Sequence, residues 1–488
     1  MRSIQLGAVA LMVLLMAVAC TPGTASTAPV RSPSGAATTA ASEPASEEPA
    51  SEEPASEEPA SEEPASEEPA SEEPAGELGT VTIPAGEPIN IACLGVLSGA
   101  NAALGEDARR GVEIAIGDRG GELLGREIQL TEEDALCTPE GGATAAQKLA
   151  ADTTIVGLIG SVCSDETVGG IQSITEAGQT TISPSNTRPA LTAEDRDATY
   201  AGYLRTAHND EVQGAVAADY VYNELGLTRA ATIHDGSAYG EALQQVFADE
   251  FAALGGTITL QTAVSVGQTD MSTVLTDVAA TTPELLYFPI FTAEGGFIAA
   301  QAADTAGLED IVLMGADGLF SADFVTAAGP NVENMYLSSP DFTAFGDQYA
   351  DFLTKYDTAY GGNPIQIFHA HGYDATNILL DAIEAVAVED GEDLVIDKGA
   401  LRDAIYATEG FQGITGTLSC SASGDCSDPA IAVYQITARE VGGEWPPEAP
   451  IWSPDEGESG IFLSQSVTDI KDEPGHDAPG SSDSYADL

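Results

Sequence analysis

From residue 89 onwards, short apolar runs alternate with amphipathic stretches along the chain. The apolar runs have the length and composition of buried strands, and they lie at residues 89–97, 127–133, 155–160, 181–183, 229–234, 258–264, 285–288, 311–315 and 335–338. Helix-like amphipathic stretches lie between them at residues 107–118, 141–151, 211–225, 240–254 and 295–306. Strands that alternate with helices of 10–15 residues are typical of βαβ units and parallel sheets. Nine strands exceed one comfortable doubly wound sheet, so the pattern predicts two α/β lobes.

The C-terminal part continues with helical patterns and then returns to strands. Helical patterns lie at residues 345–360, 365–388 and 398–408, and strand-like runs lie at residues 415–418 and 430–437. After Trp452 the chain is acidic and rich in turn residues. We therefore expect residues 453–488 to form a disordered acidic tail.

Residues 21–87 have a low-complexity composition that predicts a disordered linker. The segment opens with Ser, Thr, Ala and Pro, and then repeats Ala-Ser-Glu-Glu-Pro six times from Ala45 to Pro74. Such a segment buries too little apolar surface to offset its loss of conformational entropy. Proline and like-charge repulsion favour an extended, polyproline-II-like chain. We expect a tether that holds the folded part away from a membrane.

The N-terminus has the features of a signal peptide over residues 1–20. Arg2 precedes an apolar run at residues 6–19, which ends in Ala17, Val18 and Ala19 directly before Cys20. Small residues before a Cys resemble the bacterial lipobox, in which the Cys is acylated, although Ala17 stands where that motif usually has Leu. We expect Cys20 to anchor the chain to the outer face of the membrane. The alternative is an ordinary signal peptide with an incidental Cys.

The charge of the chain excludes some functions. Lys and Arg number 16 against 78 Asp and Glu, which gives a formal net charge of −62. Nucleic-acid binding is not expected, because a duplex binder needs a basic face that displaces counterions. An anionic membrane surface would repel the chain for the same reason. The simplest interpretation of the charge is solubility.

The sequence lacks the common catalytic motifs. It has no Gly-x-Ser-x-Gly elbow, no phosphate-binding Gly-x-x-x-x-Gly-Lys loop and no His-Glu-x-x-His pair. The chain has five His, and His369 and His371 are two residues apart, a spacing that places them on different faces of a helix. No Cys or His cluster has zinc spacing. We expect no enzyme activity, no cofactor and no metal site.

Short motifs at the predicted strand ends resemble those of a known family. They are GVLSG at 95–99, DALCTP at 134–139, IGSVCS at 159–164, ISPSNT at 182–187, YLRT at 203–206, HD at 234–235 with YG at 239–240, and GADG at 315–318. Each motif alone is weak, but together they stand in family order and at family spacing. From about Ile89 to Thr437 the chain resembles the leucine/isoleucine/valine-binding proteins, which are type I periplasmic solute receptors of ABC importers.

The resemblance implies a fold of two Rossmann-like lobes joined by three hinge crossings, with a ligand held in the cleft between them. The first lobe would comprise residues 88–206 and 341–428, and the second residues 207–340 and 429–452. The implied partners are a small amino-acid ligand and the permease of an ABC transporter. We expect a monomer.

In this family the ligand carboxylate and ammonium are bound at strand ends. Ser164 begins a helix whose free N–H groups suit an anion, and its hydroxyl can add a donor. The resemblance assigns carboxylate and ammonium contacts to Thr187 and an ammonium contact to the carbonyl of Ser185. Ser164 as a simple helix cap and Thr187 as a turn residue remain the alternatives. Asp165 and Glu166 beside Ser164 would repel a second carboxylate on the ligand.

The second lobe is expected to complete the site. Asp317 matches the family's acidic residue that pairs with the ligand ammonium, and a buried cation needs such a compensating charge. An ordinary Asp-Gly turn is the alternative. The resemblance places Tyr239 and Phe291 among the aromatic residues of the cleft, and Leu104 at a further wall position. For Tyr239 and Phe291, core packing is the alternative.

The six Cys have different expected roles. Beyond Cys20, the resemblance implies a disulfide between Cys137 and Cys163. Cys420 and Cys426 bracket a turn between two strands and could close a second disulfide, which an extracellular compartment permits. Cys93 would remain as a buried free thiol.

The sequence therefore predicts a lipid-anchored, extracytoplasmic binding protein that delivers an amino acid, branched-chain above all, to an ABC importer. A ligand sensor of the same fold is an alternative. The sequence has no attached signalling domain, so a sensor would require a partner protein that passes on the signal. Amides, urea and short peptides are alternative ligands of this family.

Overall fold

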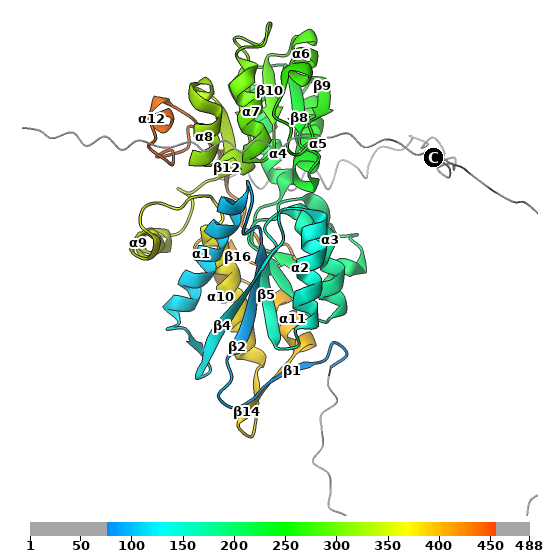
Figure 1. Ribbon diagram of the computed structural model, residues 1–488, viewed down its shortest axis with the longest axis vertical. Helices are drawn as coiled ribbons and strands as arrows, with labels where there is room; N and C mark the ends of the chain where they lie inside the picture. Colours follow the sequence, from blue (N-terminus) through cyan, green and yellow to red (C-terminus); the bar gives the residue numbers. More distant parts are fainter. Residues whose placement is uncertain (1–75, 455–488) are drawn as a thin grey trace, which may run out of the picture. The chain divides into compact units, whose positions relative to one another are not determined.

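The computed structural model describes residues 76–454, which form two α/β lobes around two six-stranded sheets (Figure 1). The predicted signal peptide, Cys20, the repeats of the linker and nearly all of the predicted tail lie outside the described residues. All nine predicted strands are present, with ends that shift by at most two residues. The predicted fold class is confirmed.

The first sheet has the strand order β3-β4-β2-β5-β6-β7. Its strands are β2 (Ile89–Gly95), β3 (Glu122–Leu123), β4 (Arg126–Asp134), β5 (Ile155–Gly160), β6 (Thr181–Ser183) and β7 (Tyr203–Arg205). All pairs are parallel except β3 with β4. Helices α1 (Ala102–Asp118) and α10 (His369–Val386) cover one face, and α2 (Pro139–Ala151) and α3 (Ser164–Glu176) cover the other. Burial on both faces explains why these strands read as continuous apolar runs.

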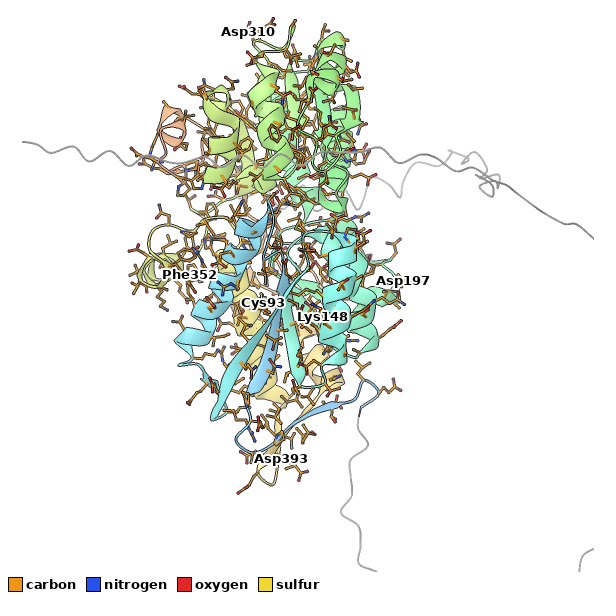
Figure 2. All side chains as sticks on the ribbon, viewed as in Figure 1. Cys93, Lys148, Asp197, Asp310, Phe352 and Asp393 are labelled. Carbon is orange, nitrogen blue, oxygen red and sulfur yellow. A yellow bond between two sulfur atoms is a disulfide. The ribbon has the colours of Figure 1, made fainter. Side chains whose placement is uncertain are left out.

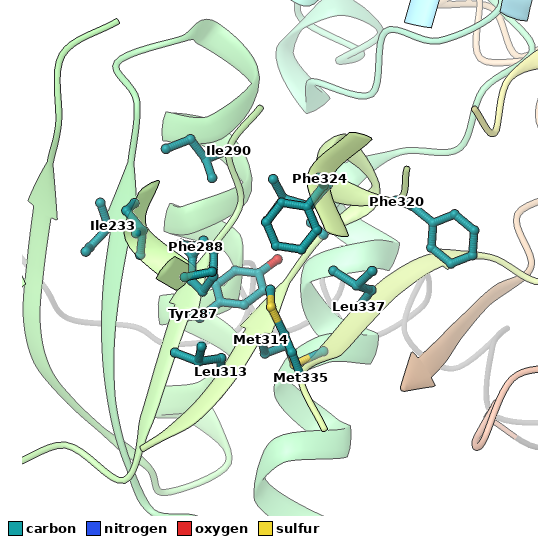
Figure 3. Packing of buried hydrophobic residues seen from close by; sticks show 14 of the residues in the cluster. Ile233, Tyr287, Phe288, Ile290, Leu313, Met314, Phe320, Phe324, Met335 and Leu337 are labelled. Atoms are coloured by element: carbon teal, nitrogen blue, oxygen red, sulfur yellow. The ribbon is translucent and has the colours of Figure 1, made fainter. Parts of the chain in front are cut away.

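The second sheet has the strand order β17-β12-β11-β10-β8-β9. Its strands are β8 (Arg229–His234), β9 (Thr257–Ala263), β10 (Leu285–Phe288), β11 (Val312–Gly315), β12 (Tyr336–Pro340) and β17 (Ile431–Gln435), of which only β17 is antiparallel to its neighbour. Its helices are α4 (Asp210–Asp219), α5 (Ala238–Ala253), α6 (Ser272–Ala280), α7 (Thr292–Ala302), α8 (Ala322–Ala328) and α12 (Ala438–Val441). Large apolar side chains such as Phe288, Met314 and Leu337 fill the core of this lobe (Figure 3).

The chain crosses between the sheets three times. It leaves β7 for α4, returns from β12 to α9 (Gln348–Tyr360), and leaves β16 (Thr417–Leu418) for β17. Fully buried Arg205 ties the first crossing to the third, because its guanidinium lies 2.6 Å from a carboxylate oxygen of Asp425. The backbone N–H groups of Arg205 and Cys426 also donate to the carbonyls of Gly424 and Arg205. The exact residue limits of the two lobes stay a prediction.

The predicted linker is wrong at its C-terminal end. Residues 80–83 form β1 (Thr80–Ile83), which pairs antiparallel with β14 (Asp393–Asp397), and β14 pairs in turn with β13 (Val388–Asp390). Val81 and Ile83 are 1% and 3% exposed, so this short alternating strand belongs to the core of the first lobe. The strand has only four residues, between Gly79 and Pro84, and this is too short for its alternation of polar and apolar residues to be recognised in the sequence.

Other elements also differ from expectation. The helix expected over residues 365–388 begins only at His369, and Val388 already belongs to the β13–β14 hairpin. Helices α6 and α8 were not predicted, and neither was the short pair β15 (Phe411–Gln412) with β16. Helix α11 (Lys398–Tyr406) agrees with the expected pattern.

Replacing Ile83 by Ala is expected to destabilise the protein by about 2–5 kcal/mol, because the methyl groups removed lie in the core. The midpoint of urea unfolding measures this loss. Thr82→Ala is the matched control, since Thr82 is an exposed residue of the same strand. Equal effects of the two substitutions would show that β1 does not pack as described.

Candidate ligand-binding site

The turn between β5 and α3 is held by the buried carboxylate of Glu166. This carboxylate accepts hydrogen bonds from the backbone N–H groups of Cys137 (2.8 Å), Val162 (2.9 Å) and Cys163 (3.0 Å). Cys163 is the N-cap residue, so Ser164 is not the cap of this helix. The Ser164 hydroxyl makes no hydrogen bond to residues 76–454, and the residue is 2% exposed.

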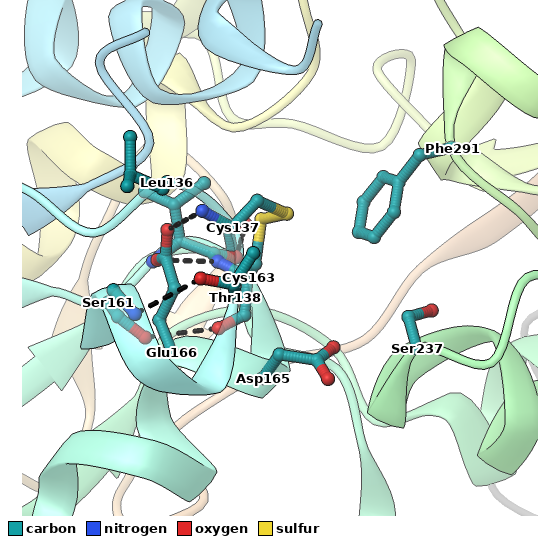
Figure 4. Close-up of a disulfide and its surroundings, with 12 residues drawn as sticks. Leu136, Cys137, Thr138, Ser161, Cys163, Asp165, Glu166, Ser237 and Phe291 are labelled. Carbon is teal, nitrogen blue, oxygen red and sulfur yellow. Dashed lines mark hydrogen bonds between the residues drawn. A yellow bond between two sulfur atoms is a disulfide. The ribbon is translucent and has the colours of Figure 1, made fainter. Parts of the chain in front are cut away.

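The disulfide between Cys137 and Cys163 lies beside this turn (Figure 4). It joins the loop after β4 to the start of α3. The second expected disulfide, between Cys420 and Cys426, is also formed.

Cys93 lies buried in β2 as a free thiol, and burial raises its pKa to about 12 (Figure 2). Among the described residues, no group of three or more His, Cys, Asp and Glu could hold a metal ion.

The loop after β6 packs against the same turn. The Ser185 hydroxyl donates to the carbonyl of Val162 at 2.6 Å, and the Ser183 hydroxyl donates to the carbonyl of Ser161 at 2.7 Å. The carbonyl of Thr187 accepts from the backbone N–H of Asp210 at 2.9 Å. This loop therefore connects the first sheet to the start of α4.

Asp317 follows β11 and is 3% exposed. The Tyr239 hydroxyl donates to its carboxylate at 2.5 Å, and the backbone N–H of Gly318 donates to the same oxygen at 3.0 Å. The second carboxylate oxygen lies 3.9 Å from Nε2 of His208. Residues 317–319 form a short 3-10 turn, so Asp317 occupies a turn and also presents a buried carboxylate.

One cavity brings all the predicted ligand residues together. Its lining comprises Leu104, Val162, Cys163, Ser164, Ser185, Thr187, Tyr239, Phe291, Asp317, Gly318 and Phe368. These residues come from both lobes, and the Tyr239 and Phe291 rings lie 5.2 Å apart. The cavity measures about 10 Å³, which is roughly the space of one water molecule. A larger ligand therefore requires the walls to move apart.

Asp165 and Glu166 both make structural contacts beside the cavity. Neither residue lines this cavity. Glu166 faces the disulfide loop, and the Asp165 carboxylate accepts from the backbone N–H of Ala238 at 2.9 Å. Ala238 is the first residue of α5, so Asp165 links the first lobe to a helix of the second. Repulsion of a second ligand carboxylate by these two side chains stays a prediction.

Asp210 is a buried residue near the site that sequence reasoning missed. It is 0% exposed, and neither carboxylate oxygen has a hydrogen-bond partner among residues 76–454. Burial, and next the Asp317 carboxylate, raise the pKa of Asp210 well above its ordinary value. Phe368 and Gly318 were also missed as lining residues. The one sequence signal for Asp210 was its position directly after the first hinge crossing, which lies close to the ligand cleft in the expected fold.

Comparison with known proteins settles the family. Residues 88–439 match the profile of the periplasmic binding proteins. The chain belongs to this family. A Leu/Ile/Val-binding protein homologue of Brucella melitensis is 27% identical over 361 residues, which cover 73% of this chain and 93% of the relative. The Leu/Ile/Val-binding protein of Escherichia coli is 29% identical over 257 residues, which cover 52% of this chain and 68% of the relative. The resemblance to the leucine/isoleucine/valine-binding proteins is confirmed.

Solved structures share the fold of this periplasmic binding protein. A leucine-binding protein from Thermotoga maritima has a TM-score of 0.65 at 24% identity, covering 74% of this chain and 98% of that one. A solute-binding protein from R. palustris, solved with benzoate, has a TM-score of 0.63 at 22% identity, covering 75% and 98%. Between residues 76 and 454, no helix is both long and apolar enough to cross a membrane.

Removing the Cys137–Cys163 disulfide by replacing both residues with Ala is expected to lower stability by roughly 2–4 kcal/mol, because the bond closes a loop with a sequence separation of 26. Thermal unfolding measures the loss. The matched double Ala variant at Cys420 and Cys426 opens a separation of only 6 and should lose less. An unchanged melting temperature in the first variant would contradict the stabilising role.

The contributions of Glu166 and Asp374 to stability should fall as the pH rises through mildly acidic values. Burial raises the pKa of Glu166 to about 7 and that of Asp374 to about 6, from ordinary values of 4.5 and 3.8. At these two residues the folded protein therefore binds more protons than the unfolded chain between these values, and their contribution to the free energy of unfolding decreases with pH there. Urea unfolding at a series of pH values measures the slope.

Replacing Glu166 by Gln should make the slope of the unfolding free energy against pH more positive than in the wild type, because the negative contribution of this buried acid is removed. Glu176→Gln is the matched control, since Glu176 is exposed on the same helix. A slope in the Glu166 variant equal to that of the wild type would contradict the assignment.

Proposed function

We propose that the protein captures an amino acid, most of all a branched-chain one, outside the cytoplasm and delivers it to an ABC importer. The observation that carries the proposal is that side chains from both lobes surround one cavity, with helix α3 beginning at its wall and the Asp317 carboxylate in its lining. These are the two groups that a zwitterion requires.

The carboxylate of the ligand would bind where α3 begins. Free N–H groups at a helix N-terminus, with the positive end of the helix dipole, favour an anion. The Ser164 hydroxyl is not used in capping and is available as a donor. Thr187 lies in the same cavity wall and would donate its hydroxyl as well.

The ammonium of the ligand would bind at Asp317. The side chains that line the cavity include no Lys or Arg, while buried Asp317 supplies a negative charge. Tyr239 donates to one oxygen of Asp317, so the carboxylate is held in place before a ligand arrives. Ser185 would offer its carbonyl as an acceptor. A ligand without an ammonium would leave this carboxylate buried and uncompensated, at a cost in free energy.

The remaining lining is apolar and favours an aliphatic side chain. Leu104, Phe291, Phe368 and the ring of Tyr239 surround the space. The names of the sequence relatives, Leu/Ile/Val-binding proteins, agree with such a ligand. A relative of known structure from Streptococcus pneumoniae was solved with isoleucine, at a TM-score of 0.65 and 22% identity.

Lobe closure would signal the loaded state to the permease. A ligand that contacts both lobes stabilises the closed arrangement by its differential affinity. The hydrogen bond between Asp165 and the N–H of Ala238 forms across the lobes and would add to the closed form. Acylation of Cys20 and the extended repeats would keep this receptor at the outer face of the membrane as a tethered monomer.

Replacing Asp317 by Ala is expected to weaken the binding of leucine or isoleucine by tenfold or more, because the ligand ammonium loses its only buried counter-charge in the lining. Isothermal titration calorimetry measures the dissociation constants. Binding of 4-methylpentanoate, which is leucine without its ammonium, should change little.

Asp310→Ala is the matched control. Asp310 is exposed and precedes β11, at the end opposite Asp317 (Figure 2). It should leave leucine binding unchanged. Leucine affinity that survives the Asp317 substitution would refute the role of Asp317, and failure of every proteinogenic amino acid to bind the wild type would refute the proposed ligand class.

A further inference from the structure

Two buried carboxyl groups lie at the ligand cavity, one in its lining and one next to it. Asp317 belongs to the lining and is 3% exposed. Asp210 is 0% exposed and lies outside the lining, but its backbone N–H donates to the carbonyl of the lining residue Thr187 at 2.9 Å. After burial, the negative charge of Asp317 is the main cause that raises the pKa of Asp210. Asp210 and Asp317 are therefore electrostatically coupled, and we call them the acid pair.

The two carboxyl groups differ in their hydrogen bonds, and this difference decides which of them holds a proton. Asp317 accepts from the Tyr239 hydroxyl and from the backbone N–H of Gly318, and both bonds favour its ionised form. Neither carboxylate oxygen of Asp210 has a hydrogen-bond partner in the described part of the chain. An ionised carboxylate buried without partners carries a large desolvation cost, so a proton shared by the acid pair resides on Asp210.

The guanidinium of Arg205 does not neutralise Asp210. Arg205 is fully buried, and its Nη2 lies 2.6 Å from a carboxylate oxygen of Asp425. Its Nη1 donates to the carbonyls of Arg188 at 2.9 Å and Asn186 at 3.3 Å. The charge of Arg205 is thus balanced by another carboxylate.

His208 is a basic side chain beside the acid pair, and it is neutral. Its Nε2 lies 3.9 Å from a carboxylate oxygen of Asp317 and 2.7 Å from Oε1 of Gln213. Nε2 of Gln213 donates to the carbonyl of Ser338, so Oε1 accepts and Nε2 of His208 carries the hydrogen. Nδ1 of His208 has no hydrogen-bond partner among residues 76–454, so no acceptor stabilises a second proton. Burial lowers the pKa of His208 further from neutral pH.

The phenolic and acidic groups nearby supply no positive charge either. Burial, followed by the negative charges of the acid pair, raises the pKa values of Tyr239 and Tyr287 well above their ordinary range, so both phenols stay protonated. Glu211, which follows Asp210 on α4, is exposed and acidic. Within the residues that the structure describes, the acid pair thus has no cation of its own, and two such carboxylates repel each other when both are ionised.

We propose that Asp210 holds a proton in the free protein and releases it to the solvent when the ligand ammonium binds beside Asp317. This inference rests on the proposed function, because the ammonium is that of the captured amino acid. In the free protein the acid pair holds one proton and one negative charge. In the complex the acid pair carries two negative charges and faces one positive charge. The net charge of these groups is therefore the same in both states, and one proton leaves for each ammonium that enters.

The proton on Asp210 makes the site respond to the ammonium without a direct contact. Asp210 acts only through its charge, because it does not line the cavity. The affinity for an amino acid should rise with pH until Asp210 ionises in the free protein, by up to about tenfold per pH unit. Glu166 would act in the opposite direction, since a ligand carboxylate bound at the start of α3 would raise its pKa further and favour proton uptake.

Isothermal titration calorimetry in buffers of different ionisation enthalpy counts the released protons, because the observed heat includes the heat of the buffer that takes them up. The probes are leucine and 4-methylpentanoate. Both carry the carboxylate, so the comparison cancels proton uptake at Glu166. Leucine should release about 0.5 to 1 proton more than 4-methylpentanoate at a pH between about 5 and 8.

Asp210→Asn keeps the shape of the protonated acid and removes its proton. This variant should still bind leucine, while the excess release falls to about zero and the affinity no longer rises with pH. Glu211→Gln is the matched control, since Glu211 is the adjacent, exposed acid of the same helix. It should keep the proton release of the wild type.

Equal proton counts for the two probes throughout this pH range would overturn the inference, and so would an unchanged excess release in a folded Asp210→Asn protein. In both cases leucine still binds, so the proposed function would stand. If no proteinogenic amino acid bound the wild type, the proposed function would fail and this inference with it. The comparison of the two probes uses the wild-type protein, so it does not depend on the stability of the variant.

Discussion

The buried carboxylate of Glu166 fixes the turn on which the candidate site is built. Three backbone N–H groups donate to it, two from the turn after β5 and one from the loop after β4. The adjacent disulfide joins the same two segments covalently. Because Glu166 satisfies these donors, Ser164 does not have to cap its own helix and can face the cavity. The structural carboxylate thereby leaves the Ser164 hydroxyl without a capping role.

The electrostatics of the cavity are unequal at its two ends. At one end Asp317 is held by Tyr239 and Gly318, with the unpartnered carboxyl of Asp210 nearby. The other polar side chains of the lining, which include Ser164 and Thr187, carry hydroxyl groups and no charge. Two buried acids favour a cation more strongly than one, and they repel each other when both are ionised. In the proposed amino-acid complex, the ligand ammonium would add a positive charge close to Asp317 and Asp210 and would favour the ionised form of both carboxyl groups.

Much of this organisation could be predicted from the sequence, for a physical reason. Buried parallel strands appear in the sequence as short apolar runs. Their carboxyl ends lie at the same edge of the sheet, so Ser164 and Thr187, which follow two such strands, could be assigned to that edge. Val81 and Ile83 were missed because two apolar residues define no period. The capping role of Glu166 and the burial of Asp210 were missed because a capping carboxylate and a buried acid look the same as surface residues in sequence.

The contact between Arg205 and Asp425 has a consequence for how the molecule moves. Cys420 and Cys426 enclose Asp425 in a short covalent ring, and this ring is bonded to β7 through Arg205. Two of the three connecting strands are thus clamped to each other as they leave the first lobe. Any bending of these two crossings would therefore begin beyond the clamp, and the two segments would move together where they leave the first lobe.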